Sequence, residues 1–286
     1  MKVAFAGLGV MGFPMAGHLA KAGHEMAVFN RSSDKAARWV AAHGGRAGAT
    51  VPDAAAGAEV FVLCVGNDDD VREVVRQALP AMAPGGVVVD HTTTSAVVAR
   101  EMAALAASDG RAFVDAPVSG GQAGAENGQL TIMCGGAPDA FARIEPVIAA
   151  YAKAIRLMGG PGSGQLTKMV NQICIAGVVQ GLAEGLHFAK RAGLDPQAVY
   201  EAISKGAAQS WQMDNRWKTM SEGKFDFGFA VDWMRKDLGL VLDEAGANGA
   251  ALDATAMVDG FYADIQKMGG ARWDTSSLVA RLEKPF

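Results

Sequence analysis

The chain has 286 residues, of which 50% are hydrophobic and 20% charged, and its formal net charge is −4 at pH 7. This composition is typical of one large or two ordinary globular domains, and the mildly acidic balance disfavours nucleic acid as a partner. No apolar stretch reaches the roughly 18 residues that a membrane span needs, so a soluble protein without a membrane partner is expected.

The first 160 residues alternate short apolar runs with amphipathic stretches. The apolar runs predict strands at 3–6, 26–29, 60–65, 86–90, 112–118, 129–136 and 154–158. The amphipathic stretches predict helices at 11–22, 33–42, 69–78, 95–107 and 138–151. Continuous apolar strands that alternate with helices predict an α/β fold with a parallel, doubly wound sheet covered on both faces.

A glycine motif lies between the first predicted strand and the first predicted helix. Gly7, Gly9 and Gly12 stand in the pattern G-x-G-x-x-G, with Leu8 and Met11 between them. The first glycine permits a tight turn, the second lets a pyrophosphate approach the backbone, and the third allows the helix to pack closely. In an alternating α/β half this motif predicts a Rossmann dinucleotide site with the phosphates at the helix N-terminus.

The second strand ends in Asn30, Arg31 and Ser32. Sites specific for NAD usually present a carboxylate here, which bonds the 2′-hydroxyl of the ribose. Without that carboxylate, Arg31 can clamp a 2′-phosphate, so NADP(H) is favoured over NAD(H). The alternative is that Arg31 is merely solvated and that Ser32 or Ser33 caps the next helix.

Two further loops follow predicted strands, where doubly wound sheets bind ligands. Thr92, Thr93 and Thr94 can offer hydroxyl groups to a cofactor, although Thr94 or Ser95 can equally cap the following helix.

The second of these loops holds Ser119, Gly120 and Gly121. Backbone N–H groups can converge in such a glycine-rich turn, and together with the serine hydroxyl they suit a substrate carboxylate. An ordinary glycine-rich turn is the alternative.

The strand pattern ends at residues 159–164, which predict a hinge. Beyond it the sequence predicts only helices, at 164–191, 195–205, 211–222, 230–247, 253–268 and 273–283. We therefore predict a Rossmann domain for NADP(H) at 1–162 and an all-helical domain for substrate and oligomer contacts at 163–286.

Lys168 lies near the start of an otherwise apolar helix and shares a face with Asn171 and Gln172. Reduction of a carbonyl by hydride leaves an alkoxide that needs a proton, and a lysine can supply it if its pKa is near the working pH. Apolar surroundings and a helix N-terminus both lower the pKa of a lysine. Lys168 is therefore the predicted proton donor, with Asn171 holding the substrate or the lysine; a surface lysine at a domain edge is the alternative.

The helical half offers two weaker candidates. Ser210, Trp211 and Gln212 are possible pocket residues, although core packing is the more ordinary role for Trp211. Lys236 and Asp237 open a long amphipathic helix, where a solvated ion pair is the ordinary interpretation.

Cysteine and histidine give no sign of a disulfide or a metal site. Cys64, Cys134 and Cys174 are far apart in apolar surroundings, which predicts buried thiols in a reducing cytoplasm. The five histidines show no close ligand spacing, so no metal ion is expected.

Taken together, four motifs resemble those of the β-hydroxyacid dehydrogenase family, which includes 3-hydroxyisobutyrate dehydrogenases, tartronate semialdehyde reductases and glyoxylate/succinic semialdehyde reductases. The motifs read GLGVMGFPMAGHL, DAPVSGG, GSGQLTKMVNQ and KDLGLVLDEA. The resemblance covers essentially the whole chain. It implies a Rossmann domain followed by a helical domain, assembled as a homodimer or homotetramer.

The resemblance also implies roles for particular residues. Ser119, Gly120 and Gly121 would bind the substrate carboxylate, Lys168 would be the proton donor or acceptor, and Asn171 would orient the substrate. Thr93 and Lys236 would contact the cofactor near its nicotinamide end.

The expected activity is hydride transfer between NADP(H) and a short 3-hydroxy acid or its semialdehyde. The chain departs from the family pattern at Gln172, where a second asparagine is frequent, and the bulky Trp211 disfavours the smallest aldehydes. An imine reductase of the same two-domain plan and a non-catalytic NADP(H)-binding scaffold are the alternatives, although both kinds of relative generally lack the lysine.

Overall fold

The structure is a computed structural model that describes residues 1–283 and divides into two compact units, Met1–Lys168 and Met169–Phe286. The two units divide within one long helix, whereas the sequence predicts a boundary between residues 162 and 163, which stays a prediction. The last three residues of the predicted second domain lie outside the described residues.

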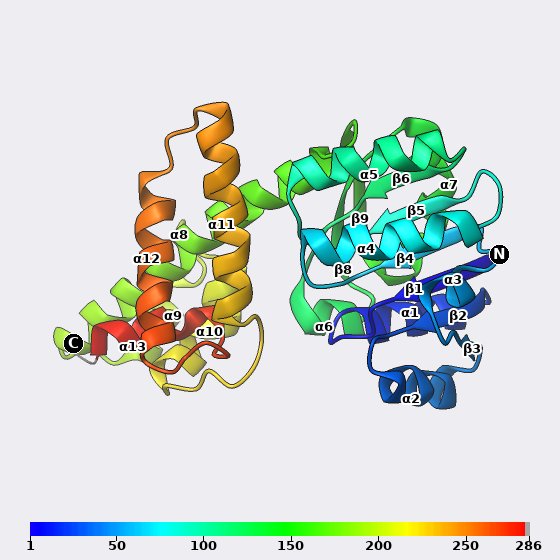
Figure 1. The fold of residues 1–286 in the computed structure, drawn as a ribbon. Helices are drawn as coiled ribbons and strands as arrows, with labels where there is room; N and C mark the ends of the chain where they lie inside the picture. Colours follow the sequence, from blue (N-terminus) through cyan, green and yellow to red (C-terminus); the bar gives the residue numbers. More distant parts are fainter. Residues whose placement is uncertain (284–286) are drawn as a thin grey trace. The chain divides into compact units, whose positions relative to one another are not determined.

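The first unit contains a mixed sheet that is mostly parallel (Figure 1). Its strands are β1 (Lys2–Ala6), β2 (Glu25–Phe29), β3 (Arg46–Ala47), β4 (Val60–Leu63), β5 (Val87–Asp90), β6 (Ala112–Asp115), β7 (Val118–Ser119), β8 (Leu130–Gly135) and β9 (Ala152–Gly159). They lie in the order β3-β2-β1-β4-β5-β6-β8-β7, and β9 pairs with β8. The order reverses at β1, so the loop that follows β1 lies where doubly wound sheets bind ligands.

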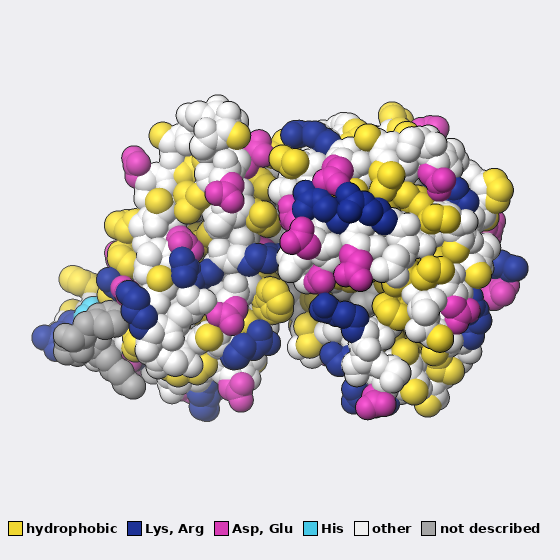
Figure 2. Space-filling model, in the orientation of Figure 1, with side chains coloured by type: hydrophobic (Ala, Val, Ile, Leu, Met, Phe, Trp, Pro, Cys, Tyr) yellow, Lys and Arg dark blue, Asp and Glu magenta, His cyan; other side chains and the backbone are white. Residues whose placement is uncertain are grey.

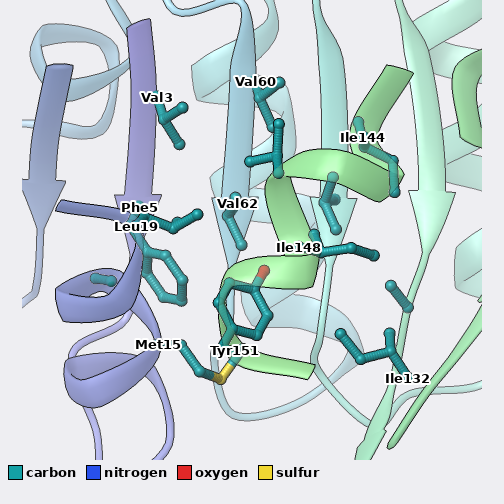
Figure 3. Packing of buried hydrophobic residues seen from close by; sticks show 14 of the residues in the cluster. Val3, Phe5, Met15, Leu19, Val60, Val62, Ile132, Ile144, Ile148 and Tyr151 are labelled. Carbon is teal, nitrogen blue, oxygen red and sulfur yellow. The ribbon is translucent and has the colours of Figure 1, made fainter. Parts of the chain in front are cut away.

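Helices cover both faces of this sheet. They are α1 (Gly12–Lys21), α2 (Ser33–His43), α3 (Val51–Ala55), α4 (Asp68–Ala78), α5 (Ala96–Ser108), α6 (Gly121–Glu126) and α7 (Pro138–Ile148), with 3₁₀ turns η1 (Leu79–Ala81) and η2 (Ala149–Tyr151). Alternate residues of β1 face opposite sides. Val3 and Phe5 pack in one apolar cluster with α1 and α7 (Figure 3). Ala4 and Ala6 pack in another cluster with α4 and α5. The predicted doubly wound α/β unit is confirmed.

The differences from the predicted elements are short and local. The predicted strand at 112–118 is broken into β6 and β7, because the chain turns at Ala116 and Pro117 and β7 then pairs antiparallel with β8. A proline has no N–H with which to continue a ladder. The short elements β3, α3 and α6 were not predicted, since they hold too few residues to show a period.

The described residues of the second unit form helices and the loops that connect them, with one isolated β-bridge between Ala230 and Asp274. Its helices are α8 (Ser163–Arg191), which begins in the first unit, α9 (Pro196–Ile203), α10 (Trp211–Ser221), α11 (Val231–Asn248), α12 (Asp253–Lys267) and α13 (Leu278–Glu283), preceded by the 3₁₀ turn η3 (Thr275–Ser277). Their apolar faces meet in one core around Trp217, Met234 and Tyr262. The predicted all-helical second half is confirmed.

The central helix α8 is less buried than its composition predicts. It supplies core residues such as Val179 and Leu186, yet one side carries Val170, Cys174 and Val178, spaced by four residues and all exposed in this chain. The prediction of three buried cysteines is confirmed for Cys134 and wrong for Cys174, whose thiol lies on the outward side of the helix; Cys64 is only partly buried.

α8 is also the one helix in the described part of the chain that is long and apolar enough to cross a membrane by length and composition. The expectation that no segment reaches that length is wrong on this measure. Core helices of soluble proteins meet the same criterion, and about 44% of the apolar window of α8 is buried inside the protein.

Charges of both signs are interspersed on the surface. On the face drawn in Figure 2, Lys and Arg side chains lie beside Asp and Glu side chains. In the first unit, for example, Glu101 pairs with Arg72 at 2.7 Å and with Arg76 at 3.0 Å. This face therefore shows no extended patch of a single sign.

Candidate active site

The three positions after β1 carry glycine for different structural reasons. Gly7 has a φ of +96°, and a Cβ there would lie 2.1 Å from the carbonyl oxygen of Cys64. A Cβ on Gly12 would lie 1.9 Å from the carbonyl oxygen of Gly7. A Cβ on Gly9 would meet no atom of the described residues within 4 Å. The fold thus requires the first and third glycines, whereas the second faces open space where a pyrophosphate can approach.

The residues between these glycines anchor the loop. Leu8 is buried, and Met11 packs against the same apolar cluster from the N-cap position of α1. Leu8 and Met11 thus leave the backbone of the loop open to a ligand, whereas Val10 is 64% exposed.

Asn30, which follows β2, joins the glycine loop to the start of α2. Its Oδ1 accepts a hydrogen bond from the N–H of Leu8 at 2.9 Å, and its Nδ2 donates to the carbonyl oxygen of Ser32 at 3.1 Å. A carboxylate has no hydrogen to donate, so it can make only the first of these bonds. The amide of Asn30 therefore has a structural role that its sequence position did not reveal.

Arg31 is the exposed cation beside this loop. Its side chain is 83% exposed, and one guanidinium nitrogen lies 3.3 Å from a carboxylate oxygen of Asp70. Ser32 occupies the N-cap position of α2 but makes no side-chain cap. Because an exposed pair of this kind is weak, the guanidinium can reorient toward an anionic ligand.

Thr93 lies between two buried threonines in the loop after β5. Thr92 is held firmly, since its Oγ1 accepts from the N–H of Val65 at 3.0 Å and its own N–H donates to Asp90 at 2.9 Å. Thr94 is buried as well, whereas Thr93 is partly exposed. Of the three, Thr93 is the one placed to meet a ligand.

Helix caps close the loops that follow β4 and β5. Asn67 Oδ1 accepts from the N–H of Asp70 at 2.9 Å, and Ser95 Oγ accepts from the N–H of Val98 at 3.1 Å. Thr94 and Ser95 were the two predicted candidates for the N-cap of α5, and Ser95 is the residue that caps the helix.

Two buried carboxyl groups lie side by side at the ends of β5 and β6. Asp90 and Asp115 are register partners in these parallel strands, and neither is exposed to solvent. Burial raises the pKa of Asp90 to about 7, and the neighbouring Asp115 adds to this shift. Burial also raises the pKa of Asp115 to about 6, although bonds from the backbone N–H groups of Gly162 and Gln165 oppose the shift.

The pKa of Asp90 predicts a pH-dependent stability that Asp90→Asn removes. The folded state holds the Asp90 proton more tightly than the unfolded chain does, so this group lowers stability as the pH rises from about 4 to 7. A shift of this size is worth roughly 2 to 4 kcal/mol. Between pH 5 and 8, the free energy of unfolding measured with urea should therefore fall more for wild type than for Asp90→Asn. The asparagine can still accept the hydrogen bond from the N–H of Thr92. Parallel pH profiles would show that Asp90 does not titrate in this range.

The serine–glycine loop begins in a strand and leaves it through left-handed backbone. Ser119 is paired in β7 with Thr131 of β8. Gly120 and Gly121 follow with φ values of +133° and +62°, and a Cβ on Gly121 would meet no described atom within 4 Å. Only glycine adopts such a sequence of angles readily, so the open turn predicted at these residues is observed.

Lys168 lies in the second turn of α8 and is only 7% exposed. The field of a helix terminus acts mainly over its first turn, so the expected contribution of the dipole is small here. Burial remains, and it disfavours the charged form of an ammonium group. The interpretation of Lys168 as a surface lysine does not hold.

In the second unit, a chain of polar side chains links α8 to α11. Asn171 donates to Gln172 Oε1 at 2.8 Å, and Gln172 donates to Asp237 Oδ2 at 2.7 Å. Asp237 is 2% exposed and lies 3.3 Å from the ammonium of Lys236, which also lies 5.9 Å from the ring centre of Trp233. The ordinary interpretation of Lys236 and Asp237 as a solvated pair is therefore wrong, because Asp237 is buried and bonded.

Trp211 is on the surface of the second unit. It opens α10 and is 52% exposed, with the guanidinium of Arg216 stacked 5.1 Å from its ring centre. The expectation of core packing is wrong, since Met213 and Trp217 of the same helix supply the core contacts instead. A role for Trp211 in binding substrate stays a prediction.

The structure thus places the predicted residues in two sets. The first unit holds the glycine loop, Asn30, Arg31, Ser32, Thr93, the Ser119 loop and Lys168. The second unit holds Asn171, Trp211 and Lys236.

Neither Gln165 nor Asp115 was predicted to be a site residue. Both are fully buried and polar. Asp115 accepts from the N–H of Gly162 in the loop before α8, and Gln165 donates to the carbonyl oxygen of Thr92 in the loop after β5. Gln165 carried one signal, since it lies one helical turn before Lys168 and therefore on the same face.

Among residues 1–283, no group of three or more His, Cys, Asp or Glu side chains is arranged to hold a metal ion.

The chain matches two family models that together span almost all of it. Residues 2–160 match the NAD-binding domain of 6-phosphogluconate dehydrogenase, and residues 162–282 match the NAD-binding domain of NADP-dependent 3-hydroxyisobutyrate dehydrogenase.

Known relatives match over their whole lengths. An uncharacterized oxidoreductase of Shewanella frigidimarina is 63% identical over 99% of this chain and 98% of its own. The 2-hydroxy-3-oxopropionate reductase of Escherichia coli is 34% identical over 99% of this chain and 97% of its own. The structure of Mycobacterium tuberculosis 3-hydroxyisobutyrate dehydrogenase with L-serine has a TM-score of 0.91 at 32% identity and covers 99% of both chains. The chain therefore belongs to the β-hydroxyacid dehydrogenase family and is an NAD(P)-dependent hydroxyacid dehydrogenase.

Proposed function

We propose that the protein transfers hydride between NADP(H) and a short 3-hydroxy acid or its semialdehyde, with Lys168 as the proton donor or acceptor. The observation that carries this proposal is the burial of Lys168 on α8. Burying an ammonium group costs free energy, which favours a functional role for this lysine. A bound nicotinamide nucleotide would supply or accept the hydride. The chain itself would supply the proton and hold the substrate.

The residues of the first unit fit such a cofactor. The glycine loop presents its backbone, and the open space before Gly9 admits a pyrophosphate. Thr93 is the partly exposed threonine of its loop, and we assign it, together with Lys236 of the second unit, to the nicotinamide end.

Five residues are proposed to bind the substrate. We assign the substrate carboxylate to Ser119, Gly120 and Gly121, because the open turn there admits an anion. Asn171 would orient the reacting oxygen, and its bond to Gln172 fixes its amide. Trp211 is the fifth proposed substrate-binding residue. Holding a short substrate at its carboxylate end aligns its carbonyl for reaction.

The preference for NADP(H) rests on Arg31. Replacing Arg31 by alanine should weaken NADPH binding about tenfold and leave NADH binding unchanged, because only the former carries a 2′-phosphate for the guanidinium. Fluorescence titration of both cofactors measures this, with the exposed Arg38→Ala on α2 as the control. Equal weakening for the two cofactors would contradict the assignment.

The substrate is tested by steady-state kinetics on a small panel. The names of the relatives point to tartronate semialdehyde, which is 2-hydroxy-3-oxopropionate, and to 3-hydroxyisobutyrate. Succinic semialdehyde, glyoxylate, methylmalonate semialdehyde, D-glycerate and L-serine complete the panel, each with NADP(H) and NAD(H). A strong NADP(H)-dependent rate on one of them supports the proposal. Activity on a cyclic imine alone would favour an imine reductase, and tight NADPH binding without turnover would favour a scaffold.

We further propose that the protein is a cytoplasmic homodimer or homotetramer and that it binds neither a membrane nor a nucleic acid. Val170 and Phe188 of α8 are 59% and 71% exposed in the single chain, and exposed apolar side chains of this size suit a contact between subunits. Light scattering measures the assembly.

A further inference from the structure

We propose that Gln165 is a positioning residue that holds the Thr92–Thr94 loop in a fixed place relative to Lys168. The inference rests on the proposed function, in which Thr93 serves the cofactor and Lys168 the proton. It adds Gln165, which lies within GSGQLTKMVNQ but was given no role by the motif.

The side chain of Gln165 is bonded on both sides of Thr93. Its Nε2 donates to the carbonyl oxygen of Thr92 at 2.7 Å, and its Oε1 accepts from the N–H of Thr94 at 3.1 Å. Gln165 is not exposed to solvent at all. One rigid amide therefore satisfies two buried backbone groups and fixes the peptide segment between them, since losing either bond would leave a buried group unpaired.

The backbone of Gln165 is held just as firmly. Asp115 accepts from the N–H of Gln165 at 2.9 Å through one carboxyl oxygen and from the N–H of Gly162 at 2.8 Å through the other. The first turn of α8 is also pressed against the sheet, because a Cβ on Gly164 would lie 2.4 Å from the carbonyl oxygen of Met133. The helix start cannot shift without breaking these contacts.

Lys168 follows Gln165 by three residues in the same helix. Residues at this spacing lie on one face, with about 5 to 6 Å between their Cβ atoms. The loop that carries Thr93 and the helix turn that carries Lys168 are thus joined by a single side chain. Hydride and proton reach the same carbonyl, so the cofactor and Lys168 must be held in a fixed position relative to each other. A misplacement of about 1 Å costs about 100-fold in rate.

The test compares Gln165→Met with Gln165→Glu. Methionine has a similar length but makes neither bond, so kcat should fall about 30- to 100-fold while the Kd of NADPH changes less than about threefold. A glutamate carboxylate would oppose the carbonyl oxygen of Thr92, whereas the protonated acid can donate to it. The kcat of Gln165→Glu, divided by that of wild type at each pH, should therefore rise as the pH falls from 8 to 5.5. The division removes the titration that the proteins share. The glutamate also lies beside Asp115 and on the helix face of Lys168, so the uncharged Gln165→Met gives the reference pH profile.

Amide hydrogen exchange gives a readout that needs neither cofactor nor turnover. In Gln165→Met, peptides that cover residues 91–96 should exchange at least about tenfold faster than in wild type, because the N–H of Thr94 loses its acceptor. Peptides of β4 should be unchanged. Gln180→Met replaces another buried glutamine of α8, which bonds Glu184, and should leave both exchange and kcat as in wild type.

Lys168→Ala, measured in parallel, distinguishes a failure of the proposed function from a failure of the positioning role of Gln165. If Lys168→Ala turns over like wild type, Lys168 is not the proton donor and that part of the proposed function is wrong. If Lys168→Ala is inactive while Gln165→Met keeps wild-type turnover and exchange, the positioning role alone is wrong. A loss of kcat in Gln165→Glu that does not recover at low pH, or that Gln180→Met shares, also overturns it.

Discussion

Lys168→Ala is expected to lower kcat by about 10³-fold and to leave the Kd of NADPH within about twofold of wild type. General acid catalysis by one positioned side chain contributes typically 10²- to 10⁴-fold. The affinity for cofactor should persist because the proposed cofactor contacts are made by other residues. Stopped-flow reduction of the best panel substrate, under single-turnover conditions, measures the affected step directly.

Two further variants exclude a loss of packing as the cause. Lys168→Met keeps most of the buried aliphatic stem and removes only the ammonium group, so it should be as slow as Lys168→Ala. Lys153→Ala removes an exposed lysine from β9 and should turn over normally. A kcat of Lys168→Met within about threefold of wild type would contradict the assignment of Lys168 as the proton donor.

Gly9→Ala is expected to weaken NADPH binding by at least about tenfold without lowering the Tm of the cofactor-free protein. The added methyl group meets no atom of the described protein within 4 Å, so folding should tolerate it. The same methyl group would occupy the space into which the pyrophosphate must come, and tenfold in affinity corresponds to about 1.4 kcal/mol. Isothermal titration with NADPH and a thermal melt of the free protein measure the two quantities.

The neighbouring glycine provides the contrast. Gly12→Ala places its Cβ 1.9 Å from the carbonyl oxygen of Gly7, so its Tm should fall by several degrees or the protein should fail to fold. Gly260→Ala, in the middle of α12, has open space and should slightly raise the Tm. If Gly9→Ala binds NADPH as tightly as wild type, the cofactor does not lie against this loop.

Periodicity predicted the long elements well because burial dictates it. The residues of β4 are buried on both faces and form a continuous apolar run, and the helices that cover the sheet repeat their apolar positions every three to four residues. The break between β6 and β7 was missed, because the pairing of β7 with β8 depends on residues about a dozen positions later.

The candidate site was predictable where a motif has a local cause. Gly7 turns with a positive φ, and a side chain on Gly12 would meet the carbonyl oxygen of Gly7 only five residues earlier, so both glycines have a local cause. The bonds of Gln165 to the loop after β5 span more than 70 positions, so no local pattern contains them. Trp211 shows the converse, since a residue type that usually packs in a core lies on the surface beside an arginine.

The two bonds of Asn30 have a consequence for redesigning the proposed preference for NADP(H). The obvious change toward NADH is Asn30→Asp, which would supply the carboxylate that bonds the ribose 2′-hydroxyl. That carboxylate would still accept from Leu8, but it would face the carbonyl oxygen of Ser32 with no hydrogen between them. A one-residue exchange would therefore loosen the turn that follows β2. An engineer who wants an NADH-dependent enzyme should rebuild residues 30–32 together.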